Sequence, residues 1–303
     1  MGNFLSKVAQ ASFAFTLLLN MLWSALLCKV LLLLPLDRRT RGKYAIAVVQ
    51  LAWKISLFFA PWMKCQANTE FSSACQEFAA QIKNSDKSRA EGADFHPTFL
   101  LGNHTSFLDT ILTVSKLPAS VAVRARTYMG AHLFNLPLLS TVCVACGHFP
   151  VYFTGSKLGD FGVDRNKMAE VEKLVDTHID GGGHLCFFPE GQMNNNPDKF
   201  CPFRYGGMKK ALQKDAKLWS FVTCGNPSMW PRKAQVGGLP GRCIYGLKSL
   251  APDGCVALVA ELRKTNRKFK DKEDYVILAE HCHEVMQGEY DKMKATMEAK
   301  KSR

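Results

Sequence analysis

Two long apolar stretches begin the chain and distinguish it from the more polar remainder. The first covers residues 13–36, with Asn20 and Lys29 as its strongly polar interruptions, and the second covers residues 44–63. A helix needs about 20 apolar residues to cross a bilayer core, and both stretches reach that length. We expect a helical hairpin that attaches the protein to a membrane. Lys29 and Lys54 leave open whether this hairpin spans the bilayer or lies in its interface.

Short signals accompany the hairpin and the end of the chain. The connection between the two stretches holds four basic residues, which favour the cytosolic side of a membrane and anionic headgroups: Arg38, Arg39, Arg41 and Lys43. A cleaved signal peptide is not expected, because the first stretch exceeds the usual run of about 7 to 15 apolar residues and no cleavage site follows. Gly2 and Ser6 fit an N-myristoylation pattern, with chance as the alternative. Lys300 and Lys301 resemble a dilysine signal of the endoplasmic reticulum, with a basic helix end as the alternative.

After residue 64 the apolar runs become shorter and alternate with helical periodicity. Residues 64–94 are polar, with apolar side chains three and four positions apart, as in an amphipathic helix. Six short apolar runs predict strands, at residues 98–101, 120–123, 142–149, 185–188, 219–223 and 254–261. Helices are predicted at residues 166–180, 207–213 and 272–299, the last of them long and highly charged. The alternation indicates an α/β fold.

The length and composition fit one domain with a membrane appendage. A chain of 303 residues holds one large core plus a further segment, and 47% hydrophobic residues are enough to fill that core. We expect a membrane-anchoring hairpin over residues 1–64 and a folded domain over residues 65–303 that ends in the charged helix. The sequence does not predict an oligomeric state.

The charge and the cysteines narrow the class of partner. A net charge of +13 favours polyanions, but the basic residues are scattered and no nucleic-acid motif is present, so lipid or phosphate partners remain and nucleic acid is not expected. Eleven cysteines, several within apolar runs, indicate buried free thiols of a reducing compartment. Cys143 and Cys146 form a CxxC pair and residues 281–283 read His-Cys-His, but neither group has a second ligand pair at zinc-site spacing, so we expect no metal.

An apolar strand that leads into polar residues is the first candidate for chemistry. Residues 100–102 are followed by Asn103 and His104 and, five places after the histidine, by Asp109. If a helix begins here, the carboxylate can return to the imidazole, fix its tautomer and stabilise the imidazolium that forms when the ring accepts a proton. His104 is then a positioned general base. The alternative is that Asp109 is only an acidic residue in the first turn of a helix.

A second apolar strand ends in Phe188-Pro189-Glu190-Gly191, at the strand end where α/β sheets bind ligands. Together, the two blocks resemble the NHxxxxD and FPEG motifs of the glycerolipid acyltransferase family, which contains the 1-acylglycerol-3-phosphate and glycerol-3-phosphate acyltransferases. The resemblance implies a mixed sheet flanked by helices, preceded by the membrane hairpin. It also implies the site residues, first the catalytic and then the substrate-binding ones: His104 and Asp109; Asn103, Arg165, Glu190, Gly191 and Arg204.

Two arginines occupy places where the resemblance implies phosphate-binding groups. A run from Gly147 reaches Arg165 after what we interpret as an inserted loop, and residues 202–206 place Arg204 after the FPEG block. A guanidinium offers a rigid fork of donors that suits a phosphate, although each arginine could instead be a surface or salt-bridging residue. The chain departs from the family at residues 192–193, which are Gln-Met where Thr-Arg is usual, and residues 226–241 match no part of the family pattern.

The resemblance implies an enzyme that moves a fatty acyl group from acyl-coenzyme A, its co-substrate, to a hydroxyl of a lysophospholipid, first of all 1-acyl-sn-glycerol-3-phosphate (lysophosphatidate). It implies no metal or other cofactor. From the dilysine pattern and the basic hairpin connection, we expect a place in the endoplasmic reticulum membrane with the catalytic domain facing the cytosol. Glycerol 3-phosphate and other lysophospholipids stay open as acceptors. Two other classes also stay open: a non-catalytic lipid-binding relative, and a lipid hydrolase with Ser106 as nucleophile, which lacks the glycine context of a nucleophile elbow.

Overall fold

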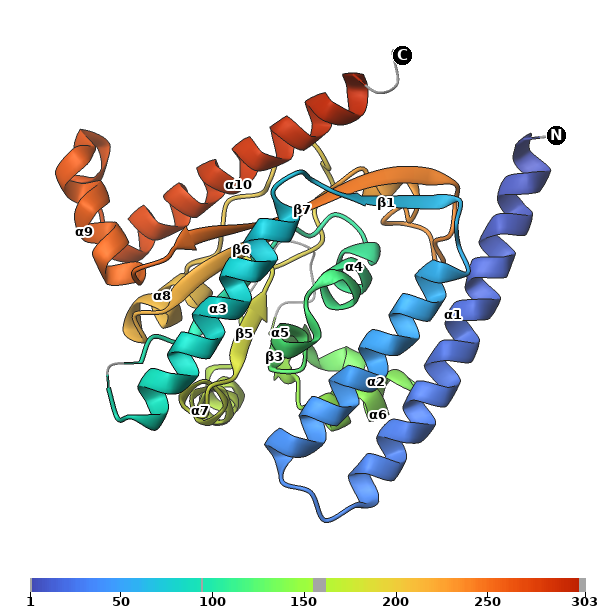
Figure 1. The fold of residues 1–303 in the computed structure, drawn as a ribbon, viewed down its shortest axis with the longest axis horizontal. Coiled ribbons are helices and arrows are strands. Elements are labelled where there is room, and N and C mark those ends of the chain that lie inside the picture. The colour runs from blue at the N-terminus through green and yellow to red at the C-terminus, as the bar shows by residue number, and fades with distance from the viewer. Residues whose placement is uncertain (1, 94, 155–161, 300–303) are drawn as a thin grey trace.

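The computed structural model describes residues 2–93, 95–154 and 162–299, which form one seven-stranded sheet with helices around it (Figure 1). Lys300, Lys301 and part of the expected inserted loop lie outside the described residues. The strand order is β1-β7-β6-β2-β5-β3-β4. The strands are β1 (Met63–Ala67), β2 (Thr98–Gly102), β3 (Ala125–Gly130), β4 (Phe149–Val151), β5 (His184–Phe187), β6 (Lys217–Cys224) and β7 (Gly241–Ala251). Neighbouring strands are parallel except β6 and β7, so the sheet is mixed, as predicted.

The central strand β2 is buried along its whole length. It is apolar apart from Thr98, as expected for a parallel strand that is covered on both faces. Phe99 and Leu101 belong to the core on one face of the sheet and Leu100 to the core on the other, because successive side chains of a strand point to opposite faces.

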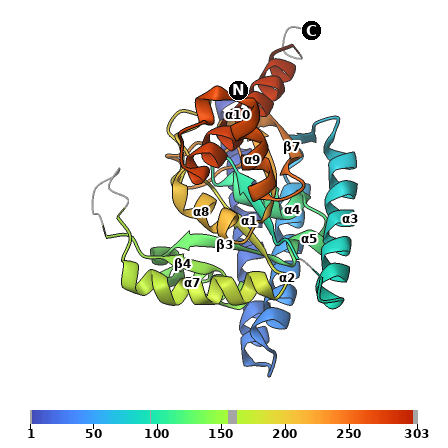
Figure 2. The same ribbon diagram turned by 90° about the vertical axis from the view of Figure 1, so that its left-hand side faces the viewer.

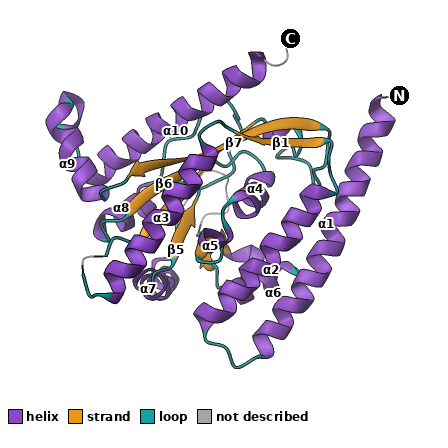
Figure 3. Cartoon of the chain, in the orientation of Figure 1, coloured by secondary structure: helices purple, strands orange, loops and turns teal. Residues whose placement is uncertain are grey.

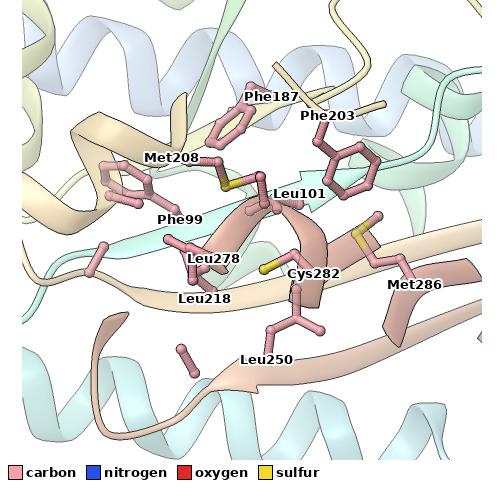
Figure 4. Packing of buried hydrophobic residues seen from close by; sticks show 14 of the residues in the cluster. Phe99, Leu101, Phe187, Phe203, Met208, Leu218, Leu250, Leu278, Cys282 and Met286 are labelled. Carbon is pink, nitrogen blue, oxygen red and sulfur yellow. The ribbon is translucent and has the colours of Figure 1, made fainter. Parts of the chain in front are cut away.

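Helices cover both faces of the sheet (Figures 2 and 3). One face packs against α7 (Arg165–Asp180), α8 (Tyr205–Gln213), α9 (Cys255–Thr265) and α10 (Asp274–Ala299). Figure 4 shows this core, in which Met208 of α8 and Leu278 of α10 lie against Phe99 and Leu218 of the sheet. The other face packs against α3 (Phe71–Ala90), α4 (Leu108–Lys116) and α5 (Ala119–Ala122). Short 3-10 helices cover Ala131–Asn135, Asn226–Ser228 and Arg267–Phe269.

The N-terminal hairpin forms and lies along one side of the sheet domain (Figure 1). Its first helix, α1 (Gly2–Leu33), packs against α2 (Arg38–Phe58) and against α6 (Leu139–Cys146). Asp37 begins α2, because its carboxylate accepts hydrogen bonds from the backbone N–H groups of Arg39 and Thr40 at 2.9 and 3.0 Å. Among the described residues, one helix is long and apolar enough to cross a membrane, α1 over Phe4–Leu33. The second apolar stretch belongs instead to α2, which buries one face within the protein.

Three of the predicted strands are helices instead. Residues 120–123 overlap α5, residues 142–149 fall mostly in α6, and residues 254–261 begin α9. A short apolar run does not distinguish a buried strand from a buried turn of helix; in α9, Cys255 and Val259 face the core four residues apart. Strands β1, β3 and β7 lie outside the predicted runs. Because β1 crosses residue 64, the expected boundary between anchor and domain falls inside a strand of the sheet.

Candidate active site

Two neighbouring parallel strands bring the two candidate motifs together. β2 and β5 pair with Leu101 opposite Phe187, so the chain leaves both strands at the same edge of the sheet. The backbone N–H of His104 donates to Glu190 Oε1 at 3.0 Å, and the N–H of Asn194 donates to the carbonyl oxygen of His104 at 2.6 Å. Ligands of α/β sheets bind at this carboxyl edge of the parallel strands. The NHxxxxD and FPEG blocks therefore form one site.

His104 and Asp109 form a dyad within this site. His104 Nδ1 lies 3.3 Å from Asp109 Oδ2, and the histidine side chain is 18% exposed whereas the aspartate is 1% exposed. If Nδ1 carries the proton, it donates to the carboxylate, and the other ring nitrogen is left as an acceptor. No described residue forms a hydrogen bond with that second nitrogen. The ring can therefore take a proton from a group that arrives from outside, with the carboxylate behind it.

The carboxylate of Asp109 is held on both of its oxygens. Its Oδ2 accepts the backbone N–H groups of Thr105 and Ser106 at 2.6 and 2.8 Å, which is the geometry of an acidic residue in the first turn of α4. Its Oδ1 accepts the Thr223 hydroxyl at 3.1 Å and the side-chain N–H of Asn226. Asp109 is therefore both the partner of the histidine and an acidic residue in the first turn of the helix. Thr223 and Asn226 are not among the predicted site residues.

The imidazole of His104 also stacks on the ring of Phe188, with 4.1 Å between ring centroids and 9° between planes. Gly102 makes room for this arrangement, because a Cβ at that position would lie 2.9 Å from an edge carbon of Phe188. The first residue of the FPEG block thus fixes the plane of the ring, while Asp109 fixes its rotation in that plane. Phe188 is part of the FPEG block but is not among the predicted site residues, and the motif does not indicate its contact with His104.

Asn103 and Glu190 are buried behind the histidine. Asn103 is 1% exposed, and its side chain exchanges hydrogen bonds with the backbone of Thr223, at 2.9 Å to the carbonyl and 2.8 Å from the N–H. Glu190 is fully buried, and its Oε2 accepts the side-chain N–H of Asn194 and the backbone N–H of Cys201 at 2.7 and 2.8 Å. Burial raises the pKa of Glu190, while these N–H donors act in the opposite direction. In this geometry both side chains hold loops of the site together, and direct contact with substrate stays a prediction.

The structure brings Arg204 to the FPEG turn. Its backbone N–H donates to the carbonyl of Pro189 at 2.7 Å, and its side chain is exposed. Gly191 adopts a φ of +73°, in the left-handed region that favours glycine, and a Cβ there would lie 3.0 Å from Arg204 Cγ. A guanidinium beside this turn is placed at the same edge of the sheet as His104.

Arg165 lies farther from His104. It begins α7 after Asp164, whose carboxylate accepts the N–H of Lys167 at 3.1 Å, and its side chain is exposed. α7 follows the edge strand β4, which is three strands from β2 and thus roughly 14 Å away at the usual strand spacing. An open pocket of about 250 Å³ lies at the β4 edge, lined by Ala131, His132, Val151, Tyr152, Phe153, Thr154, Asp164 and Lys167. Arg165 stands beside this pocket and not beside the dyad.

Ser106 does not present a nucleophile at this site. It is fully buried, and its hydroxyl donates to the carbonyl of Trp230 at 2.7 Å and accepts the N–H of Leu108 at 3.2 Å. These contacts hold Ser106 in the turn that precedes α4. Within residues 2–93, 95–154 and 162–299, no group of three His, Cys, Asp or Glu side chains is arranged to hold a metal ion. All eleven cysteines are free thiols.

Comparison with known proteins agrees with this geometry. Residues 80–223, which include the dyad and the FPEG turn, match the model of the acyltransferase family, and this match confirms the resemblance that the motifs predict. The fold is similar to the crystal structure of the 1-acyl-sn-glycerophosphate (LPA) acyltransferase PlsC from Thermotoga maritima, with a TM-score of 0.63 and 13% identity over 97% of this chain and 98% of that chain. A search of curated protein sequences found no match.

Proposed function

We propose that this chain transfers a fatty acyl group from acyl-coenzyme A to the free hydroxyl of lysophosphatidate, which yields phosphatidate and coenzyme A. The observation that carries the proposal is the asymmetry of the dyad: the imidazole of His104 is accessible, whereas the carboxylate that orients it is 1% exposed. A general base needs an accessible nitrogen and a fixed orientation, and His104 has both.

The chemistry is that of an oriented general base. His104 Nε2 takes the proton of the acceptor hydroxyl while the oxygen attacks the thioester carbonyl, and Asp109 stabilises the imidazolium without taking the proton. The tetrahedral intermediate then expels the thiolate of coenzyme A, the carbon–sulfur bond breaks, and the imidazolium returns its proton to the sulfur. General-base help of this kind contributes about 10²- to 10⁴-fold in rate. Positioning of both substrates must supply the rest.

The choice of lysophosphatidate rests on the arginines and on the related structure. Arg204 lies beside the FPEG turn and Arg165 beside the open pocket, and each offers a guanidinium for a phosphate at the carboxyl edge of the sheet. PlsC, which shares the fold, is an LPA acyltransferase by its description. Glycerol 3-phosphate and larger lysophospholipids are the alternative acceptors, because residues 192–193 depart from the family pattern.

Membrane attachment through α1 fits a lipid substrate. The outer side of α1 exposes large apolar residues along its length, including Phe4 at 70%, Phe15 at 63% and Leu33 at 80%. α1 also packs against α6 of the sheet domain, so a spanning α1 would draw polar parts of that domain into the hydrocarbon region. We therefore propose that the hairpin lies in the membrane interface. We also propose that the membrane is that of the endoplasmic reticulum, with the catalytic domain in the cytosol, the side that the basic hairpin connection favours.

The test measures transfer of labelled oleate from oleoyl-coenzyme A to lysophosphatidate, glycerol 3-phosphate and lysophosphatidylcholine, with wild type beside His104→Ala. His96→Ala is the matched control, because His96 Nδ1 also lies 3.3 Å from an aspartate, Asp215, but at the opposite end of β2. We expect transfer to lysophosphatidate that is lost in His104→Ala and kept in His96→Ala. Transfer to none of the three acceptors, or full activity of His104→Ala, would contradict the proposal.

A further inference from the structure

The loop between β6 and β7, residues 225–240, contacts the active site from one side. It contains residues 226–240 of the stretch that matches no part of the family pattern, and the family match ends before it, at residue 223. Asn226 is fully buried, and its side-chain N–H groups donate to Asp109 Oδ1 and to the Thr105 hydroxyl, the latter at 3.2 Å. A carboxylate only accepts hydrogen bonds, so the amide nitrogen of Asn226 must face Asp109.

The same loop holds the turn that separates His104 from Asp109. The carbonyl of Trp230 accepts the Ser106 hydroxyl at 2.7 Å, and the indole ring lies 5.7 Å from the ring of Phe107. With the contact from Asn226 to Thr105, the loop thus contacts each of the three residues 105–107 that come after the histidine. A shift of this loop would move the carboxylate relative to the imidazole.

The other side of the loop is braced by α1. Phe13 is fully buried, and its ring packs edge-on against Trp230 with 5.9 Å between centroids. Gln10 donates from its side chain to the carbonyl of Val236 at 2.8 Å. Gly238 lets the helix approach, because a Cβ there would lie 2.5 Å from Cβ of Phe13. The inner side of the helix that carries the exposed apolar surface therefore supports the loop that holds the dyad.

We propose that the β6–β7 loop positions the dyad, with Asn226 as a positioning residue that holds the Asp109 carboxylate toward His104 and with α1 as its outer support. The proposal rests on the proposed roles of His104 and Asp109. Asn226 acts through Asp109 and does not contact the reacting atoms. A neutral donor is required at this position, since a second carboxylate would repel Asp109 and an apolar side chain would leave Oδ1 with fewer donors.

The first experiment compares Asn226→Ala and Asn226→Asp with wild type by kcat, KM and the pH profile of kcat. Asn226→Ala should lower kcat about tenfold or more at unchanged KM, because small displacements of a catalytic group have costs of this order. Asn226→Asp keeps the shape but creates a carboxylate pair, which is compatible with the dyad only while it shares a proton. Its activity should therefore fall as the pH rises and its pH optimum should shift to a lower value. The matched control is Asn266→Asp, the same change at the exposed residue that precedes the 3-10 helix Arg267–Phe269, which should leave kcat and its pH profile unchanged.

The second experiment separates the support by α1 from membrane attachment. Phe13→Ala and Phe15→Ala remove the same side chain two residues apart, one buried against Trp230 and one 63% exposed on the outer side. On vesicles of phosphatidylcholine and phosphatidylserine, Phe13→Ala should bind as wild type does but lose kcat several-fold, with partial recovery in Phe13→Leu. Phe15→Ala should bind more weakly and keep the kcat of the bound fraction. Equal behaviour of the two variants would overturn the role of α1.

The failures of the two proposals are distinguishable. If wild type is inactive or His104→Ala is active, the proposed function fails, and the loop has no dyad to position. If wild type is active and His104→Ala is not, but Asn226→Ala and Asn226→Asp keep the kcat and pH profile of wild type, the proposed function stands and the positioning role of the loop is overturned.

Discussion

Two histidine–aspartate pairs lie at opposite ends of β2 with the same separation. His104 and Asp109 come after the strand, His96 precedes it and pairs with Asp215 before β6, and in both pairs Nδ1 is 3.3 Å from a carboxylate oxygen. A search for such pairs by distance alone would give them equal weight. Their surroundings differ in ways that separate a site from a structural contact.

The difference lies in what holds the carboxylate. Asp109 is 1% exposed and accepts four hydrogen bonds besides its contact with the histidine. Asp215 is 35% exposed, has a positive φ of 42°, and uses Oδ1 to accept the N–H of Val256 at the start of α9. The first carboxylate has one orientation, toward the histidine, whereas the second stabilises a helix end. The first pair also lies at the carboxyl edge of the parallel strands, where substrates bind.

The largest expected effect is the loss of activity in Asp109→Asn, for which the same change at Asp215 is the control. Asp109→Asn places an NH₂ group among donors. If that group faces His104, the histidine loses its orienting acceptor; if it faces Thr223 and Asn226, the histidine keeps only a neutral amide oxygen, which stabilises the imidazolium less than a carboxylate does. We expect acyl transfer to fall about 10²- to 10⁴-fold, the range of general-base contributions. Steady-state transfer to lysophosphatidate measures it, with circular dichroism to verify folding.

Asp215→Asn is the control for this change. An asparagine tolerates a positive φ and can still accept the N–H of Val256, so activity should stay within about twofold of wild type. Equal losses in the two variants would mean that the fold, and not the oriented base, accounts for the effect at Asp109.

A smaller effect concerns stability at the other end of β2. Asp215→Ala removes the acceptor at the start of α9 and puts alanine at a positive φ. Loss of such a helix cap typically lowers the free energy of unfolding by about 0.5 to 2 kcal/mol, and we expect a value in the upper half of that range with acyl transfer unchanged. Urea unfolding in detergent measures it. The control is Asp253→Ala at an exposed residue of the turn before α9, where the free energy of unfolding should not change. A loss of acyl transfer in Asp215→Ala would instead assign the pair of His96 and Asp215 a part in the reaction.

The sequence predicted the catalytic end of β2 well, because its signal is local. His104, Asp109 and the FPEG turn are each recognisable within ten residues, and both β2 and β5 coincide with predicted apolar runs. The supports of the site were not predicted. Thr223 and Asn226 meet Asp109 from 114 and 117 positions away, through the neighbouring strand β6, and no local pattern specifies that contact.

The errors in the fold have a similar origin. The runs at residues 120–123 and 254–261 each contain two buried apolar residues, Val121 with Ala122 and Cys255 with Val259, and the burial of so few side chains does not fix the period. β1 and β7 escaped prediction because their polar and apolar residues alternate irregularly, and pairing with neighbours in the sheet decides their conformation. Arg165 matched a motif position, yet its place beyond β4 depends on the strand order, which motif spacing does not show.

The last prediction concerns three histidines on the amino side of the sheet, where burial excludes the protonated form. Burial, with nearby arginines, lowers the pKa of His148 and His184 to about 3 and that of His178 to about 4. In the unfolded chain these groups titrate near pH 6.5. Between pH 6.5 and 4 the unfolded state therefore binds more protons than the folded state, so stability is fully present above pH 6.5 and is lost as the pH falls.

Each of these histidines should contribute about 1 kcal/mol per pH unit to that slope. We expect the urea midpoint to fall between pH 7 and pH 5, and to fall less in His184→Phe, which has no proton to gain and can still pack on Phe78. His132→Phe, at an exposed position, should keep the slope of wild type. A wild-type midpoint that is the same at both pH values would mean that these histidines accept protons in the folded protein. Their burial would then not distinguish them from the accessible His104.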